Sequence, residues 1–360
     1  MLRLAEAADG FVARVRLPGG LVFAGQLRVL AWLAGELGDG RIELTSRGNV
    51  QLRGLAADAA GPLTDALWRA GLLPSPSHDR VRNVLASPLA GLDRGPDLTG
   101  IVRALDAALC ARPRLAELSG RFLFAVDDGR GDVAGLGADV VATVRPDGAV
   151  VNGLSVRQAG VPGNDVLAEV ALHAGSAETG GMRDDIVAAM LACAEAFLDL
   201  RAELDNAAWR VADLPGGAAR VRATVSARLG LAACPEERGA APTARPVGLV
   251  AAQEAGRDSV VLLAPLGRLT AAQLSWVADR VAGQAARITP WRSVVLPGLA
   301  GAPGVLREAA GLGFGTDEAS PWLRVTACAG RPGCASALAD VQADAAGFAA
   351  RWPGDRKSVV

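Results

Sequence analysis

Apolar and polar side chains alternate along residues 41–55 of this chain. The apolar positions are Ile42, Leu44, Val50 and Leu52, with Ser46 and Gly48 interrupting them. The polar positions are Arg41, Glu43, Thr45, Arg47, Asn49, Gln51 and Arg53. Alternation with a period of two is typical of a half-buried β-strand. The pattern therefore predicts one continuous strand, with an apolar face packed inward and an opposite face that carries three arginines.

The composition of that polar face suggests an anionic ligand. From Thr45 onward the face carries only arginine and neutral hydrogen-bonding groups, whereas solvated sheet faces usually mix charges of both signs. Guanidinium groups bind carboxylates through two parallel hydrogen bonds. An ordinary solvated face is the alternative interpretation. We favour a surface that binds a polyanionic ligand.

The flanking sequence predicts a strand–helix–strand–helix unit that occurs twice. One helix is expected over residues 26–37, before the arginine-rich strand, and another over 63–70, after it. Residues 264–299 repeat the order of helix and strand, and an alignment without gaps places Thr45 against Thr289. Such a unit is about half of a ferredoxin-like fold. The sequence therefore predicts two duplicated half-domains.

A separate α/β region is predicted between the two copies. Strands are expected at residues 119–127 and 140–144, and a long helix at 182–206. Residues 234–246, which combine proline, glycine and charged side chains, are typical of a linker. The fold class predicted for the whole chain is therefore mixed α/β, with α+β half-domains.

The composition is typical of a folded protein and argues against several other classes. The 360 residues are 51% hydrophobic and 21% charged, which is typical of a folded protein with roughly two to three domains. A net charge of −1 argues against a general nucleic-acid binder. Apolar runs are too short to span a membrane, and no apolar leader follows the first residues. Five scattered cysteines do not indicate a disulfide framework. We therefore expect a cytoplasmic protein that acts on neither nucleic acid nor membrane.

Cys328 and Cys334 enclose a turn rich in glycine and proline. The spacing alone is a weak signal, because two loop cysteines are more often incidental than ligands. The turn could direct backbone N–H groups toward cluster sulfides. A strand is expected at residues 322–326 and a helix at 335–351, so the helix dipole would favour a thiolate at Cys334. The pair is therefore a candidate metal site.

Three aspartates, Asp127, Asp128 and Asp132, surround the glycine-rich segment 129–131. Their spacing does not fit the ligand pattern of an EF-hand calcium loop. Carboxylates near glycines are also common in exposed turns. We therefore expect a solvated turn here and not a cation site.

Three segments carry a resemblance to a known family. They are TSRGNVQLRG at residues 45–54, AADGFVARVRLPGG at 7–20 and TACAGRPGCASALADV at 326–341. The first resembles the core motif of the sulfite and nitrite reductase family, whose members bind a sirohaem beside a [4Fe–4S] cluster. Together the three resemble the precorrin-3B synthase branch of that superfamily, which acts in oxygen-dependent cobalamin synthesis.

The resemblance implies a set of residues that bind the tetrapyrrole. They are Arg47, Asn49, Gln51, Arg53, Arg82, Asn83, Arg121 and Arg292. Arg292 is the weakest of them, because it aligns with Gly48 in the first half-domain and not with Arg47. Arg47, Arg53, Arg82 and Arg121 are expected to converge on one cleft.

The resemblance also implies the metal site. Cys328 and Cys334 would supply two of four cluster thiolates, and in the family the other two come from a C-x3-C pair further on. This sequence has no such pair, and Cys110, Cys193 and Cys234 stand alone. We therefore expect either a missing C-terminal portion or a degenerate copy, and half of the ligands of a [4Fe–4S] cluster. A sirohaem-like iron tetrapyrrole or a mononuclear iron is a further candidate cofactor.

Four domains follow from the resemblance. They are a first ferredoxin-like half-domain at residues 1–75, an α/β tetrapyrrole-binding domain at 76–240, a second half-domain at 241–303, and the start of an α/β iron–sulfur domain at 304–360. The half-domains are expected to pair with lobes of the nitrite and sulfite reductase type, of which the last is incomplete.

The implied activity is oxygen-dependent hydroxylation and lactone formation on precorrin-3A, which gives precorrin-3B. A uroporphyrinoid substrate is a disc edged with carboxylates, which suits arginine, and dioxygen and an electron donor system would be the partners. Leu123 stands where anion-reducing members carry a basic residue, and an apolar side chain cannot bind or protonate an oxyanion. The alternatives are a sirohaem-dependent sulfite or nitrite reductase, and a tetrapyrrole-binding protein without a cluster.

Overall fold

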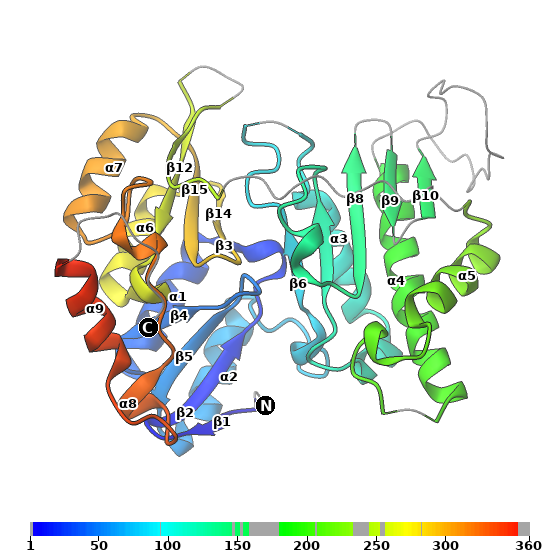
Figure 1. The fold of residues 1–360 in the computed structure, drawn as a ribbon, viewed down its shortest axis with the longest axis horizontal. Coiled ribbons are helices and arrows are strands. Elements are labelled where there is room, and N and C mark those ends of the chain that lie inside the picture. Colours follow the sequence, from blue (N-terminus) through cyan, green and yellow to red (C-terminus); the bar gives the residue numbers. More distant parts are fainter. Residues whose placement is uncertain are drawn as a thin grey trace. The chain divides into compact units, whose positions relative to one another are not determined.

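The computed structural model divides the chain into two compact units (Figure 1). The ranges described are 3–93, 95–145, 148–151, 154–157, 180–205, 207–232, 245–252, 256–281 and 283–351. One unit, here called the flanking unit, combines Met1–Asp79 with Arg245–Val360. The other, the central unit, is Arg80–Ala244.

The flanking unit contains two copies of one series of elements. The first copy comprises β1 (Ala5–Ala7), β2 (Gly10–Val15), β3 (Leu21–Phe23), α1 (Ala24–Glu36), β4 (Arg41–Leu44), β5 (Val50–Leu55) and α2 (Ala60–Arg69). The second comprises β11 (Gly248–Val250), β12 (Asp258–Leu263), β13 (Arg268–Thr270), α6 (Ala271–Arg280), β14 (Ala285–Ile288), β15 (Ser293–Leu299) and α7 (Ala302–Gly311). The predicted pair of ferredoxin-like half-domains is confirmed.

The two copies exchange strands. One sheet has the order β1-β2-β5-β4-β13 and the other β11-β12-β15-β14-β3, so each copy contributes one strand to the sheet of the other. Helices α1 and α6 pack against each other, and one apolar core takes residues from both copies. Its buried members include Leu30, Leu33, Ile42, Leu52, Leu274, Val277 and Leu296. Because the core is shared, the half-domains support each other.

The expected single strand over residues 41–55 is wrong. The segment forms a hairpin, in which β4 and β5 pair antiparallel with Ile42 opposite Leu52. The hydroxyl of Thr45 accepts hydrogen bonds from the backbone N–H groups of Arg47 and Asn49, which turns the chain. Ser46 and Gly48, the two residues that interrupt the apolar positions, lie in this turn. The alternation was therefore correct within each strand but missed the turn.

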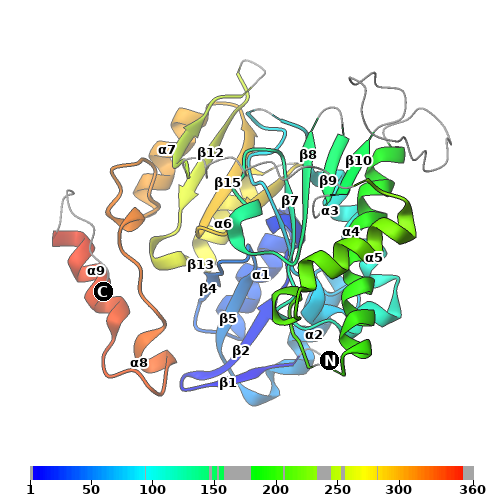
Figure 2. The same ribbon diagram turned by 45° about the vertical axis from the view of Figure 1, so that its right-hand side comes forward.

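The central unit is a five-stranded sheet covered by helices. Its strands are β6 (Val84–Ala86), β7 (Phe124–Asp127), β8 (Val140–Arg145), β9 (Gly148–Val151) and β10 (Leu154–Arg157), in the order β10-β9-β8-β7-β6. Its helices are α3 (Thr99–Cys110), α4 (Gly180–Glu203) and α5 (Gly217–Leu229). Figure 2 shows α4 along the sheet, with α5 beside it. None of the helices within the described ranges is both long and apolar enough to cross a membrane.

The end of the described chain differs from expectation. Residues 321–323 form a 3-10 turn in place of the expected strand, α8 spans Gly330–Gly333, and α9 spans Val341–Arg351. Cys334 has extended backbone angles (φ −129°, ψ 120°) and is followed by a turn. The helix after the cysteines thus begins well beyond Cys334, and the argument from its dipole is wrong.

Candidate functional site

The turn of the first half-domain fixes Asn49 and presents Arg47. The side-chain oxygen of Asn49 accepts a hydrogen bond of 2.8 Å from the backbone N–H of Leu17, and Asn49 is 1% exposed. Gly48 closes the turn with a left-handed φ of 63°. Arg47 is partly exposed at the turn, while Gln51 on β5 accepts a hydrogen bond from Arg14. Asn49 therefore holds the turn in place, and Arg47 can face a ligand.

The second half-domain repeats this turn with a different residue at its left-handed position. The hydroxyl of Thr289 accepts a hydrogen bond from the N–H of Ser293, as Thr45 does from Asn49. Arg292 takes the position of Gly48 and has the same φ of 63°. A Cβ added to Gly267 would lie 2.6 Å from Cδ of Arg292, so the arginine side chain runs directly over that glycine. The turn and Gly267 together set the direction of this guanidinium.

Arg53 is held inside the flanking unit. It is 8% exposed, and its Nε and Nη2 donate hydrogen bonds of 3.0 Å to the two carboxylate oxygens of Asp9. Nη2 also donates to the carbonyl of Gly333 at 2.7 Å, and Glu43 lies 3.9 Å from Nη1. Burial lowers the pKa of this guanidinium, but the hydrogen bond to Asp9 and the charges of Glu43 and Asp9 raise it above its usual value.

Arg82 and Asn83 are buried in the central unit. Arg82 forms two parallel hydrogen bonds of 2.7 Å with the carboxylate of Asp106. The side-chain amide of Asn83 donates to the carbonyls of Arg80 and Gly120, at 3.1 and 2.9 Å. Both side chains thus connect the start of β6 to neighbouring segments of its own unit.

Arg121 and Leu123 differ in exposure although only one residue separates them. Arg121 is exposed and its guanidinium lies 4.2 Å from the ring centre of Trp209, a cation–π contact. Leu123 is 3% exposed and belongs to an apolar cluster with Leu85 and Val133. Leu123 is therefore a core side chain of the central unit.

The predicted site residues thus belong to two units. Arg47, Asn49, Gln51, Arg53, Arg292, Cys328 and Cys334 are in the flanking unit, and Arg82, Asn83 and Arg121 are in the central unit. The convergence of four arginines on one cleft stays a prediction. Sequence reasoning missed Asp9, Asp106 and Trp209, the partners of these arginines. Asp9 and Arg53 are 44 residues apart and Asp106 and Arg82 are 24 apart, so no local pattern indicates either pair.

The described cysteines differ in their accessibility. Cys328 is exposed and Cys334 is partly exposed. Burial raises the pKa of Cys110 to about 11, with a further contribution from Asp106, and burial alone raises that of Cys193 to about 12, so neither favours a thiolate. Cys234 lies outside the described residues. A [4Fe–4S] cluster takes four ligands, so Cys328 and Cys334 do not by themselves form a site for one.

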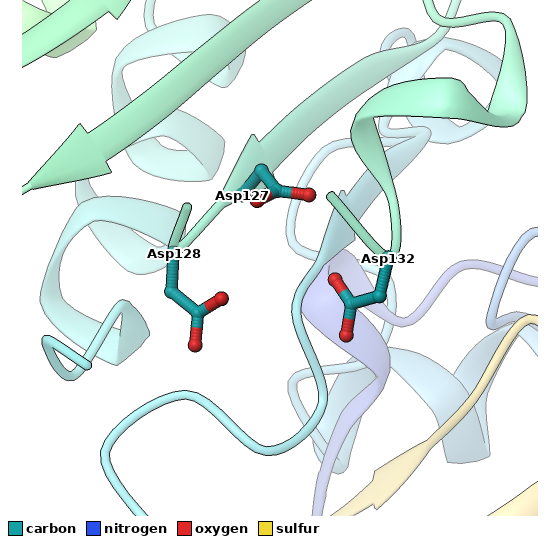
Figure 3. Close-up of side chains that lie close together, drawn as sticks. All are labelled: Asp127, Asp128 and Asp132. Atoms are coloured by element: carbon teal, nitrogen blue, oxygen red, sulfur yellow. The ribbon is translucent and has the colours of Figure 1, made fainter. Parts of the chain in front are cut away.

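The aspartate cluster is not the solvated turn that we expected. Asp127 is fully buried, and four backbone N–H groups donate to its carboxylate, those of Gly129, Gly131, Val133 and Ala134. One carboxylate oxygen from each of the three aspartates lies within 4.8 Å of the other two (Figure 3).

The carboxylates of Asp128 and Asp132 also have partners within the unit. Arg130 pairs with Asp128 at 2.7 Å. Ser87 donates a hydrogen bond of 2.5 Å to Asp132. Burial, with the nearby charges of Asp127 and Asp128, raises the pKa of Asp132 to about 6, against the opposite effect of Ser87. These contacts explain the cluster as a structural anchor of the loop after β7.

Comparison with known proteins finds that part of the flanking unit is similar to reductases. Residues 4–69 match the family model of the nitrite/sulfite reductase ferredoxin-like half domain. The chain is 34% identical over 124 residues to a ferredoxin–nitrite reductase of Leptolyngbya laminosa, which covers 32% of this chain and 24% of that protein. It is 33% identical over 142 residues to a precorrin-3B synthase of Sinorhizobium sp. That alignment covers 39% of this chain and 29% of the synthase. The alignments thus span about a quarter of these relatives.

A solved structure supports the fold. The structure of the Mycobacterium tuberculosis NirA protein matches with a TM-score of 0.72 and 21% identity, over 94% of this chain and 63% of that one. At this identity the match speaks for the fold alone. The chain therefore has the mixed α/β fold of that protein, carries a ferredoxin-like half domain of the nitrite/sulfite reductase type, and is homologous to nitrite reductases over part of its length.

Proposed function

We propose that the protein is an oxidoreductase that converts precorrin-3A to precorrin-3B. In this reaction the ring-junction carbon C-20 is hydroxylated and an acetate side chain closes a γ-lactone. One atom of dioxygen enters the product and the other leaves as water, which takes two electrons and two protons from a donor. The similarity to a precorrin-3B synthase supports this proposal.

The observation that carries the proposal is the environment of Leu123. Anion-reducing members of the family that the sequence resembles have a basic residue at this position. Here the side chain is 3% exposed and packs with Leu85, Ala125 and Val133. An apolar core residue neither holds an oxyanion nor gives it a proton. The replacement favours a different reaction at a retained tetrapyrrole site.

Arginine side chains would bind the acidic edge of the substrate. Arg47 and Arg292 are partly exposed at equivalent turns of the two half-domains, and Arg121 is exposed beside Trp209. Each can form charge-assisted hydrogen bonds to an acetate or propionate group. Arg53 and Arg82 already bind carboxylates of the chain, so they contribute to the ligand only through their remaining donors or through position.

A sulfite or nitrite reductase is the second candidate function. The match of residues 4–69 to the reductase half domain and the similarity to ferredoxin–nitrite reductases favour it. In that case the tetrapyrrole is a bound sirohaem and ferredoxin is the electron donor. A tetrapyrrole-binding protein without turnover is the third candidate, and it is favoured by the two thiols where a cluster takes four.

Product analysis separates these candidates. The purified protein, reconstituted anaerobically with iron and sulfide, is given precorrin-3A, a chemical reductant and isotopically labelled dioxygen. The proposal expects a product that has gained one labelled oxygen atom. Turnover of nitrite or sulfite with reduced methyl viologen, and none of precorrin-3A, would favour the reductase. Binding of the tetrapyrrole without either turnover would favour the third candidate.

Affinity for the tetrapyrrole tests the arginine assignment. Arg47→Ala should weaken binding by about 1.5–3 kcal/mol, the range for hydrogen bonds to charged groups. Arg69→Ala on the exposed side of α2 is the control, because it removes a cation of the same unit far along the chain from the turn. The measurement is a fluorescence-quenching titration. An unchanged affinity in Arg47→Ala contradicts the assignment.

A further inference from the structure

We propose that the arginine-rich face of the first half-domain positions Cys328 and Cys334, two accessible thiols among the described residues. The cysteine loop, residues 328–334, lies against an ion-pair network made of Asp9, Glu43, Arg53 and Arg268. Arg53 acts in this proposal as a positioning residue for Cys334 and not as a ligand of substrate carboxylates. The proposal goes beyond the proposed function, because it holds whichever reaction the protein performs.

Arg53 binds the end of the loop that carries Cys334. Its Nη2 donates to the carbonyl of Gly333, the residue directly before that cysteine, at 2.7 Å. The fork of Nε and Nη2 on Asp9 fixes the plane of the guanidinium, so the direction of this donor is set. Because the side chain is buried, the hydrogen bond is shielded from competing water.

The backbone of the loop lies close to the network at Gly333, so a larger residue there would displace the end of the Arg53 side chain. A Cβ added there would lie 2.8 Å from Nη2 of Arg53 and 3.2 Å from a carboxylate oxygen of Asp9. In both ribbon views α8, which ends at Gly333, lies beside the β1–β2 hairpin, whose turn carries Asp9 (Figures 1 and 2). The contact is therefore made between the backbone of the loop and the ends of two side chains, Arg53 and Asp9, which are fixed by their own ion pair.

Arg268 holds the other end of the loop. It pairs with Glu43 at 3.3 Å and hydrogen-bonds to the side chain of Gln342 on α9. The amide of Gln342 in turn donates to the carbonyl of Cys328 at 3.1 Å. Glu43 lies between Arg53 and Arg268, so one network reaches both cysteines.

The network joins the two half-domains at the loop. Arg268 comes from β13 of the second copy, which pairs with β4 of the first, the strand that carries Glu43. A cavity of about 260 Å³ lies at this junction, and its lining includes Arg41, Arg331 and Asp340. The relative placement of the two thiols therefore depends on the exchange of strands between the copies.

Site-resolved alkylation tests the proposal. The full chain is treated with iodoacetamide at one pH, and mass spectrometry gives the rate at each cysteine. Arg53→Ala should raise the rate at Cys334 at least about tenfold, because the loop end loses a charge-assisted hydrogen bond. Cys328, still held through Gln342, should change by less than about twofold. Arg268→Gln should instead raise the alkylation rate at Cys328 more than the rate at Cys334.

Three further variants keep the test decisive. Arg53→Lys retains the cation and should restore a slow rate at Cys334 in part. Asp9→Asn, which leaves the arginine in place, should raise that rate less than Arg53→Ala and covers the case in which Arg53→Ala does not fold. Arg28→Ala removes an exposed ion pair with Asp279 in the same unit and should leave both rates unchanged.

The result that overturns the proposal is also specific. Unchanged rates at Cys334 in folded Arg53→Ala and Asp9→Asn exclude positioning by Arg53. An equal rise at Cys328 and Cys334, without rescue by Arg53→Lys, shows only a general loss of stability and also excludes it. None of these measurements uses a tetrapyrrole, so their failure is distinct from the failure of the proposed function.

Discussion

The first half-domain has glycine at the left-handed position of its hairpin turn, whereas the second has arginine. Gly48 and Arg292 both have a φ of 63°. In each turn a threonine hydroxyl accepts a hydrogen bond from the backbone N–H four residues on, that of Asn49 or of Ser293. These hydrogen bonds define the turn, so it forms even with a strained residue. The turn therefore tolerates either glycine or a residue with a long side chain at its left-handed position.

A second difference concerns what each copy packs against. A Cβ on Gly20 would lie 2.0 Å from the carbonyl oxygen of Ile288, which belongs to β14 of the other copy. The equivalent Gly267 faces the side chain of Arg292 in its own copy. Backbone in a sheet cannot yield, whereas a side chain can rotate. The contact between copies is therefore more sensitive to substitution than the contact within one.

The largest expected effect breaks the contact between copies. Gly20→Ala should lower the free energy of unfolding by about 3–5 kcal/mol, from overpacking against the backbone and a left-handed alanine. Gly267→Ala, with a similar φ of 74°, should cost only about 1–2 kcal/mol because Arg292 can move. Urea unfolding measures both. Equal losses would show that the two glycines are equivalent and would remove the distinction.

A smaller effect is expected at the backbone N–H that binds each hairpin turn, which donates to a side-chain oxygen in the first copy and to a backbone carbonyl in the second. Asn49→Ala leaves the buried N–H of Leu17 without its 2.8 Å acceptor and should cost about 1–3 kcal/mol. In the second copy, the N–H of Ala264 donates to the backbone carbonyl of Arg292. Ser293→Ala should therefore cost only about 0.5–1.5 kcal/mol, from its bond to Thr289. The same unfolding curves test this, and a larger loss for Ser293→Ala contradicts it.

The smallest effect concerns the left-handed position itself. Gly48→Ala should cost about 1 kcal/mol, because alanine is strained at this φ. Arg292→Gly should change stability by less than about 1 kcal/mol, since relief of strain offsets the greater freedom of the unfolded chain. Thermal unfolding of the two variants measures both changes in stability. A larger loss in Arg292→Gly than in Gly48→Ala would mean that Arg292 serves packing and not a ligand.

Much of the fold could be predicted from local patterns. The alignment of Thr45 with Thr289 indicated the duplication, and the structure has the same turn at both places. Helix α1 was expected at residues 26–37 and spans Ala24–Glu36. Such features depend on residues close together in the chain, whose spacing the sequence shows directly.

The candidate site was less predictable, for a physical reason. The alternation along residues 41–55 correctly placed Glu43, Gln51 and Arg53 on the polar face of the hairpin. It did not indicate which other segments pack against that polar face. Arg53 binds Asp9 and Gly333, which are 44 and 280 residues away in the chain. An arginine that binds a ligand and one that binds a carboxylate of its own chain look alike in a sequence. Only the partner distinguishes them.

The sequence by itself determined the duplicated half-domains, the buried strand faces and the cysteine turn, because these follow from periodicity and from residues that neighbour one another. The tertiary structure alone decided that each copy contributes a strand to the sheet of the other and that Arg53 binds the backbone of the cysteine loop at Gly333. It also decided that Leu123 belongs to the core. Such contacts form between distant segments, and they depend on which surfaces meet when apolar faces are buried together.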